Sequence, residues 1–387
     1  MAVLKFYNTY VVQRRGRRLV VDVYILTNMT RKLDYKKKLL IYGPIAVSMV
    51  ILAALVYPNL DDLLVTMKTA RFFHLFMALF FSFTSYLFMG MSLWEVLKIL
   101  GHRLPFWEAS GVSFVSTTVN YFVSSGGVSG FATRAHLLSK RHIPYGISVT
   151  SSVVISVFIY LVLSVIIVEG MVLQMLKSSS YGISVFQGVI GVLFVLAFAF
   201  FLILMFFHQD LRYAWSRKLY KLGNHLLYFF SKKEIPEETF LQFEAQLTDG
   251  IRTIQSRKYE LPLVLAYVCL DWVSNILILH FAFKAVGAHM HTSTLIIGFA
   301  LGQLMTVIPI LPGGLGAMEA AMTAAYSGMG IPVGKALAAS LIFRFLYYII
   351  PAFGSIFIYW GLRMSEPRYD FSKHSLNSHR NGAGHDA

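Results

Sequence analysis

Residues 309–319 read PILPGGLGAME and interrupt sequence that is otherwise hydrophobic enough to lie in a membrane. Two prolines and three glycines break a helix here, and a glutamate follows the break. A bilayer penalises unpaired backbone amides and buried charge, so a broken helix at membrane depth is stable only where it lines a protein cavity or site. The stretch therefore predicts a helical membrane protein with a site at this break.

A second interruption of the same kind lies in the first half of the chain, where residues 124–134 read SSGGVSGFATR. Three glycines again permit a turn, and an arginine follows them. Two broken hydrophobic segments, one in each half of a chain, are typical of transporters that bind their substrate near the middle of the membrane. The pair predicts a transporter-like site formed by both breaks.

The composition is that of an integral membrane protein. Of 387 residues, 56% are hydrophobic and 14% are charged, whereas soluble domains carry about 25% charged residues. The single cysteine, Cys269, excludes a disulfide framework and a cysteine-based metal site. The twelve histidines show no H-E-x-x-H spacing, so we expect neither a metal nor a cofactor.

The net charge of +15 is sorted along the chain, which indicates membrane topology and argues against a nucleic-acid partner. Residues 1–38 contain ten Lys and Arg against two acids, and 208–260 contain nine against seven. The loops 58–71 and 169–183 together hold three of each. The positive-inside rule places the basic segments, and with them both termini, in the cytoplasm. The expected location is the plasma membrane, which is the inner membrane of a bacterium.

Hydrophobic lengths predict an all-α polytopic membrane protein with about six full spans and two oppositely directed re-entrant hairpins, an arrangement like that of inverted repeats. The full spans are expected at about 39–57, 72–93, 146–168, 184–207, 261–284 and 336–361. The hairpins are expected at 106–141 and 293–330. Eight full spans are the alternative, because 106–123 is nearly long enough to cross.

Three regions follow from this pattern. Residues 1–38 form a basic cytoplasmic segment, 39–362 form the transmembrane domain, and 363–387 form a disordered cytoplasmic tail. Within the domain, 208–260 are expected to form amphipathic helices on the cytoplasmic surface, because Trp215, Leu219 and Leu222 recur at helical spacing among basic residues. A solvated loop is the alternative for this segment.

The first hairpin offers a phosphate site. A break at Gly126, Gly127 and Gly130 exposes amides at a helix start, which favours an anionic group, and Arg134 can hold a phosphodiester with two hydrogen bonds. Asn120, just before the break, can supply a further hydrogen bond. The alternative is that Arg134 only anchors the hairpin end at the interface.

The second hairpin offers an ionisable group. Pro312, Gly313, Gly314 and Gly316 form the turn, and Glu319 begins the next helix. A carboxylate at this depth must be paired with a cation, be protonated or lie in a water-filled cavity. We expect Glu319 to be a proton- or cation-responsive group, one half of a structural pair with Arg344 or Arg134, or both.

Two further side chains complete the candidate set. Gln303 precedes the second break and is expected to line the same cavity. Asp271 lies within a predicted span, where an ionisable side chain is a functional candidate by default. No residue pattern indicates a catalytic nucleophile, so no catalytic residue is predicted.

The motifs resemble those of the transmembrane region of lysylphosphatidylglycerol synthetases, a family also called flippase-like or YbhN-type. Three segments carry the resemblance: Gly126-Gly127 through Arg134-Ala135-His136-Leu137-Leu138, Pro312-Gly313-Gly314-Leu315-Gly316-Ala317-Met318-Glu319-Ala320, and Leu341-Ile342-Phe343-Arg344-Phe345. The first departs from the family in having Val128 and Ser129 where an acidic residue often follows the glycines.

The resemblance implies a membrane lipid translocase that moves a phospholipid or a polyprenyl-phosphate-linked lipid between leaflets. In full-length synthetases a separate soluble domain transfers lysine to the lipid, and we expect this chain not to carry that activity alone. The alternative is a head-group-modifying enzyme of the phosphatidylglycerol lysyltransferase type, or the membrane partner of a separately encoded synthase. The expected partners are anionic or phosphate-bearing lipids.

Overall fold

The computed structural model describes residues 13–14, 17–18, 49–122, 128–177, 193, 197, 200–201, 204, 208–231, 236–307 and 312–365. These residues are helical apart from short connections and a small hairpin of β1 (Gln13–Arg14) and β2 (Arg17–Arg18). Five helices are long and apolar enough to cross a membrane: Met49–Thr66, Phe72–Ile99, Tyr145–Leu173, Lys258–Ala285 and Val333–Met364. The chain is an all-α polytopic membrane protein, as predicted.

The central spans are unbroken helices of membrane length. They are α3 (Phe72–Ile99), α6 (Tyr145–Lys177) and α10 (Leu261–Ala285), the last preceded by η2 (Lys258–Glu260). The final span is built from three pieces, α13 (Val333–Arg344), the π-helical turn η4 (Phe345–Ile349) and α14 (Ile350–Met364). Each of these spans exceeds the length of about 20 residues that crosses a hydrocarbon core.

The helix of the first span continues past the predicted end at residue 57. Helix begins in the described part at Met49 and continues through η1 (Tyr57–Asn59) and α2 (Leu60–Lys68), so the loop predicted from residue 58 was wrong. Pro58 fits the first turn of η1, where no backbone N–H is needed, and two aspartates lie in the first turn of α2. The predicted span 184–207 lies outside the described residues except for five helical positions.

Two helix pairs lie between the spans and form hairpins. The first hairpin consists of α4 (Phe106–Phe122) and α5 (Val128–Ser139), which pack against each other. The second consists of α11 (Thr292–Val307), the short turn η3 (Pro312–Gly314) and α12 (Ala317–Gly328). α5 and α12 have 12 residues each, about 18 Å, which is shorter than the roughly 30 Å of hydrocarbon in a bilayer. α4 has 17 residues, so the choice between re-entrant hairpins and eight full spans stays a prediction.

The hairpins start from opposite ends of the bundle. The N–H of Arg71 donates to the carbonyl of Ala285 at 2.9 Å, so α3 begins where α10 ends. Arg257 donates to the carbonyl of Ile99 at 2.8 Å, so α10 begins where α3 ends. Because α6 starts at the end where α3 finishes, and α13 starts where α10 finishes, residues 100–144 return to one end and residues 286–332 return to the other.

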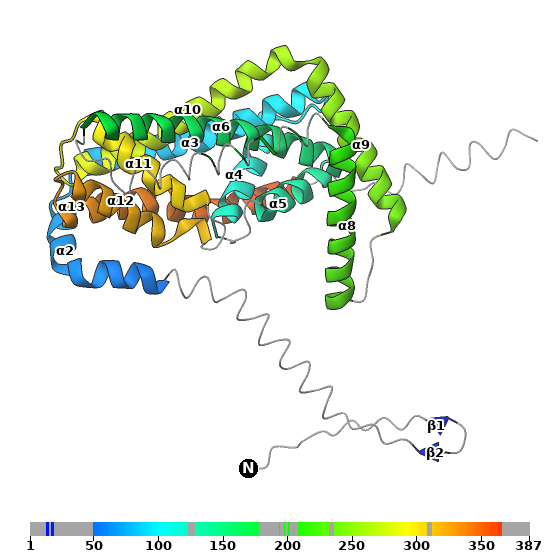
Figure 1. Cartoon of the computed structure of the whole chain (residues 1–387), viewed down its shortest axis with the longest axis horizontal. Coiled ribbons are helices and arrows are strands. Elements are labelled where there is room, and N and C mark those ends of the chain that lie inside the picture. Colours follow the sequence, from blue (N-terminus) through cyan, green and yellow to red (C-terminus); the bar gives the residue numbers. More distant parts are fainter. Residues whose placement is uncertain are drawn as a thin grey trace, which may run out of the picture.

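The helices α8 (Gln209–Ser231) and α9 (Glu237–Ser256) run across one end of the bundle, at a large angle to the spans (Figure 1). This is the end where α3 and α14 finish. α9 packs closely on the start of α6, and glycines on both helices permit this approach. A Cβ at Gly146 of α6 would lie 2.5 Å from the Cβ of Gln246, and a Cβ at Gly250 of α9 would lie 2.7 Å from the hydroxyl of Thr150. The predicted amphipathic segment is thus helical, and its cytoplasmic location stays a prediction.

The apolar core is largest around the second hairpin. Phe283 packs there edge-on against Tyr326, and the ring of Tyr326 covers Gly298, where a Cβ would come within 2.2 Å of the ring. The Tyr326 hydroxyl donates to the carbonyl of Leu295 at 2.8 Å. This contact fixes α12 against α11 and gives the second hairpin a rigid base.

Candidate functional site

The tips of the two hairpins meet inside the bundle. A Cβ built on Gly313, in the turn of the second hairpin, would lie 2.8 Å from the carbonyl oxygen of Tyr121, in the last turn of α4. Gly313 also has a φ of 51°, which favours glycine. The structure places the turn of the second break against Tyr121, three residues before the first break, and that the two breaks form one site stays a prediction.

Glu319 and Arg344 form a buried ion pair behind the second tip. Glu319 is 1% exposed, and its carboxylate accepts hydrogen bonds from the Arg344 guanidinium and, at 2.7 Å, from the N–H of Gly316. Arg344 also donates to the carbonyl of Gly313 at 2.9 Å. One carboxylate and one guanidinium therefore satisfy the backbone groups that the break leaves open.

The predicted pairing alternatives are resolved in this structure: the partner of Glu319 is Arg344, and Arg134 lies elsewhere. The guanidinium of Arg344 stacks on the ring of Tyr348, with its central carbon 4.2 Å from the ring centroid. A cation over an aromatic face is held by the ring quadrupole. The last span thus supports the second hairpin through two consecutive turns.

Arg134 is buried in the first hairpin, 6% exposed, with a different kind of environment. Its described hydrogen bonds go to two neutral hydroxyls, Ser116 on α4 and Ser152 on α6, each at 3.3 Å. No acidic side chain within the described ranges forms an ion pair with it. The positive charge of a buried guanidinium is not neutralised by hydroxyl partners, so such a group is suited to bind an anion.

The first hairpin is tightly packed around this arginine. A Cβ on Gly130 would lie 2.9 Å from the Cβ of Asn120 and 3.0 Å from the carbonyl of Ser116, so Gly130 is required for close helix approach. Asn120 is half-buried, and its side-chain oxygen has no hydrogen-bond partner among the described residues. Gly126 and Gly127 lie outside the described residues.

The remaining predicted residues lie along the second hairpin. Gln303 is buried in α11, and its side-chain oxygen is 3.4 Å from the hydroxyl of Thr306. Pro312 opens η3. Gly314 and Gly316 have φ values of 66° and 82°, so the turn depends on glycine at these positions as it does at Gly313.

Asp271 is the centre of a separate buried cluster between α10 and α3. It is 5% exposed and accepts hydrogen bonds from the Ser85 hydroxyl and, at 3.2 Å, from the Asn275 amide. The Ser85 hydroxyl lies 3.5 Å from that of Tyr347, which is 3.0 Å from the hydroxyl of Tyr121. The Asp271 cluster therefore reaches the tip of the first hairpin.

Sequence reasoning missed the tyrosines of the last span and Ser85. The π-helical turn places Tyr347 and Tyr348 together in the interior, and such turns are frequent at functional sites. The sequence feature that indicates an irregular helix here is Pro351, because it has no N–H to donate to the carbonyl of Tyr347. The carbonyls of Leu346 and Tyr347 accept instead from the α3 hydroxyls of Ser82 and Tyr86, at 2.8 and 3.0 Å.

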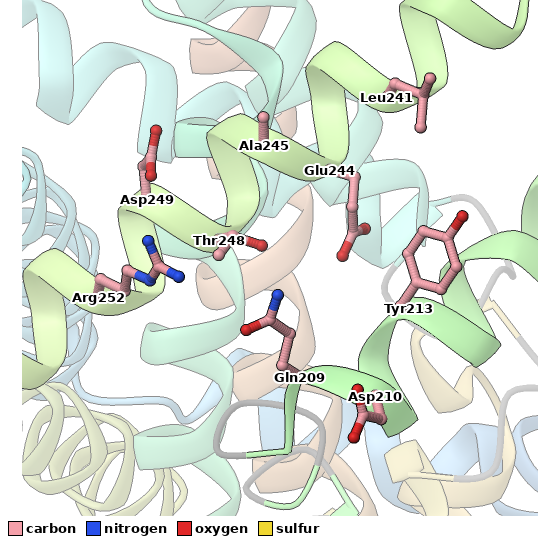
Figure 2. A pocket seen from close by; sticks show the side chains of 9 residues that line it. All are labelled: Gln209, Asp210, Tyr213, Leu241, Glu244, Ala245, Thr248, Asp249 and Arg252. Carbon is pink, nitrogen blue, oxygen red and sulfur yellow. The ribbon is translucent and has the colours of Figure 1, made fainter.

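A cavity of about 450 Å³ lies between α8 and α9, away from the hairpin tips (Figure 2). Gln209, Asp210 and Tyr213 of α8 line it opposite residues of α9 (Figure 2). The α9 residues are Leu241, Glu244, Ala245, Thr248, Asp249 and Arg252. None of the predicted site residues lines this cavity.

In the part of the chain that the structure describes, no group of three or more His, Cys, Asp or Glu side chains is placed to hold a metal ion.

Comparison with known proteins gives one family. Residues 41–354 match the family described as the lysylphosphatidylglycerol synthase TM region. A UPF0104 membrane protein of Methanothermobacter thermautotrophicus is 31% identical over 130 residues, which cover 32% of this chain and 39% of that protein. Phosphatidylglycerol lysyltransferases of Staphylococcus aureus strains COL and MRSA252 are 30% and 29% identical over 83 residues, 21% of this chain and 10% of each relative. The chain thus matches less than half the length of these curated relatives.

Proposed function

Because this chain belongs to the family of the lysylphosphatidylglycerol synthase transmembrane region, we propose that it moves a phosphate-bearing lipid between the two leaflets of its membrane. The lipid is a phospholipid or a polyprenyl-phosphate-linked lipid. Its head group is held where the hairpin tips meet, and its chains remain in the bilayer. The membrane is the bacterial inner membrane, with the basic end of the bundle in the cytoplasm.

Arg134 is the observation that carries this proposal. It is a buried guanidinium whose described hydrogen bonds go to serine hydroxyls. Burying such a charge costs free energy that a bound anion would offset. Its partner Ser116 precedes Tyr121 by five residues on α4, a rise of about 7.5 Å, so the guanidinium lies within one head-group length of the hairpin tips.

The Glu319–Arg344 pair serves as the hinge of the second hairpin in this mechanism. A phosphate that reaches the tips competes with the carboxylate for the Arg344 guanidinium, because both are anions that arginine binds with two hydrogen bonds. Exchange of one for the other releases the Gly313 carbonyl and the N–H of Gly316 from their side-chain partners. The turn can then move when a head group is bound.

The staphylococcal relatives are named as lysyltransferases, and they align with this chain over 10% of their own length. We propose that any lysine transfer linked to this chain is performed by a separate synthase, which supplies the charged lipid that the chain moves.

The test is reconstitution of the purified chain into liposomes that carry fluorescent phosphatidylglycerol on the inner leaflet. Accelerated appearance of the label on the outer leaflet, at a rate above that of protein-free liposomes, supports translocation. A matched lipid with an uncharged glycosyl head group and no phosphate tests the chemistry, and it should move more slowly. Equal rates for both lipids, or no acceleration of either, would overturn the proposal.

A further inference from the structure

The carboxylate of Asp271 differs from that of Glu319 in its partners. Glu319 faces a guanidinium, whereas the hydrogen bonds described for Asp271 come from a hydroxyl and an amide, both neutral. A charged carboxylate in the middle of a span is costly unless a cation compensates it. Asp271 is therefore placed to take up and release a proton, not to anchor an ion pair.

Three hydroxyls lead from this carboxylate to the hairpin tips, and we name them the hydroxyl chain. Ser85 donates to Asp271, Tyr347 lies 3.5 Å from Ser85, and Tyr121 lies 3.0 Å from Tyr347. Each hydroxyl can donate one hydrogen bond and accept another, so such a chain can point in either direction. The π-helical turn of the last span supplies the middle hydroxyl.

The ionisable groups on the elements around Asp271 are tyrosines and, mostly toward the span ends, charged side chains. Tyr86 of α3 donates to the backbone carbonyl of Tyr347 and so is outside the hydroxyl chain. α11 has no acidic, basic or tyrosine side chain between Thr292 and Val307. The other ionisable groups on the elements packed around Asp271 are His74, Glu95 and Lys98 of α3, Tyr267, Cys269, His280 and Lys284 of α10, Tyr145, Tyr160, Glu169 and Lys177 of α6, and Lys335, Arg344, Tyr348, Tyr359 and Arg363 of the last span.

The cations in that set lie away from the cluster. Arg344 is held by Glu319, and Lys335 donates to the carbonyl of Gly287 at the end of the bundle. Lys284 is in the last turn of α10, thirteen residues or about 20 Å along the helix from Asp271. The protonation of Asp271 is therefore governed by its neutral surroundings.

We propose that Asp271 binds a proton and that the hydroxyl chain links this proton to head-group binding at the hairpin tips. The link to head-group binding rests on the proposed function, whereas proton binding by Asp271 does not depend on it. When Asp271 is charged, every hydroxyl of the chain donates toward it, and Tyr121 donates to Tyr347. When Asp271 is protonated, the carboxyl donates to Ser85 and the chain reverses, so the Tyr121 hydroxyl donates toward the tips.

The step conserves protons and charge. A proton that arrives at Tyr121 displaces that residue's own proton to Tyr347, the Tyr347 proton moves to Ser85, and the Ser85 proton moves to Asp271. Each hydroxyl ends neutral, and the carboxylate becomes a neutral acid. The reversed chain then offers a phosphate one additional hydrogen bond from Tyr121, so a protonated Asp271 favours the loaded state.

The proton site is tested without any lipid transport. Infrared spectra of the full chain in lipid nanodiscs are recorded across a pH titration, for wild type and for Asp271→Asn. We expect the carbonyl band of a protonated carboxylic acid in wild type, lost as the pH rises, and its absence from the variant. Identical titrating bands in the two proteins would overturn the assignment.

The link to transport is tested in the liposomes described above. Wild type should move phosphatidylglycerol roughly tenfold faster at acidic than at alkaline pH, the effect of one added hydrogen bond. Tyr347→Phe and Ser85→Ala interrupt the chain and should reduce this ratio to about one, since the bond that differs between the two states is lost. Tyr267→Phe removes a hydroxyl of α10 for which the structure describes no hydrogen bond to the chain, and it should keep the wild-type ratio.

The outcomes separate the two proposals. An unchanged pH ratio in both Tyr347→Phe and Ser85→Ala would overturn the hydroxyl chain. If wild type moves no lipid at any pH while the Asp271 band still titrates, the transport function is refuted and the proton site stands. If lipid moves while the band is the same in Asp271→Asn, the proton site is refuted and the transport function stands.

Discussion

Glu319 and Arg344 form a buried ion pair that joins the turn of the second hairpin to the last span. The pair does more than neutralise two charges. Its carboxylate accepts from the N–H of Gly316 and its guanidinium donates to the carbonyl of Gly313, so both sides of the broken helix depend on it. The pair is the point at which a change in charge would reshape the hairpin tip.

Glu319→Gln should destabilise the protein strongly, because it leaves the Arg344 guanidinium buried without an anion. Loss of one partner of a buried pair costs about 3–5 kcal/mol. The double variant Glu319→Gln/Arg344→Met should lose less than this single variant, because it removes both charges. The thermal midpoint in detergent measures the effect.

Glu260→Gln is the matched control for that measurement. Glu260 pairs with Arg257 at 2.7 Å, but both side chains are 42% exposed, and exposed pairs contribute about 0–1 kcal/mol. Equal shifts of the midpoint in Glu260→Gln and Glu319→Gln would contradict the structural role of the buried pair.

Gly313→Ala should disrupt the contact between the hairpin tips. The new methyl group would face the Tyr121 carbonyl at 2.8 Å, and the backbone would be held at a φ that costs an L-residue about 1–3 kcal/mol. Gly328→Ala is the control, since a Cβ there meets nothing within 4 Å, and it should be neutral or stabilising. The prediction fails if the two alanine variants have the same thermal midpoint.

The π-helical turn predicts a coupling between Tyr86 and Pro351. Tyr86→Phe leaves the Tyr347 carbonyl without its donor, which should cost about 1–3 kcal/mol. Pro351→Ala supplies a backbone N–H that can take over this carbonyl. Tyr86→Phe should therefore cost less in the Pro351→Ala background, and additive effects in the double-mutant cycle would argue against this explanation.

Because the two hairpins start from opposite ends of the bundle, we expect residues beside them to be accessible to reagents from opposite sides of the membrane. In a Cys269→Ser background, a cysteine at exposed Lys140, after the first hairpin, should react with an impermeant maleimide from the cytoplasmic side. A cysteine at exposed His289, before the second hairpin, should react from the outer side. Labelling of both positions from the same side would contradict the arrangement of the bundle.

Most of the architecture could be predicted from hydrophobic length and charge placement. The broken stretches at 124–134 and 309–319 predicted hairpins, and the sorted charge predicted that they point in opposite directions. The predicted end of the first span at residue 57 is wrong, because Pro58 and the two aspartates after it indicate a loop by composition alone. They are equally compatible with the start of a helix, and only tertiary structure decides between these two uses.

The candidate site was predicted in part. Glu319 and Arg344 could be paired because an intramembrane carboxylate demands a cation, and each is charged in an apolar segment. Tyr347 and Ser85 could not be found in this way, because tyrosine and serine are common in spans as packing residues. Their importance depends on the π-helical turn, which rotates one tyrosine toward Asp271 and is set by Pro351 together with hydroxyls from a distant helix.

The central claim is that buried Arg134 binds the phosphate of a translocated lipid, and the most direct measurement is the transport rate of phosphatidylglycerol in liposomes for three proteins. Arg134→Gln should move it about 10–100 times more slowly than wild type, the loss expected for a hydrogen bond to a charged group. Lys140→Gln, which removes an exposed cation at the end of the same hairpin, should match wild type. Equal rates for wild type and Arg134→Gln, in protein shown to be folded, would contradict the account.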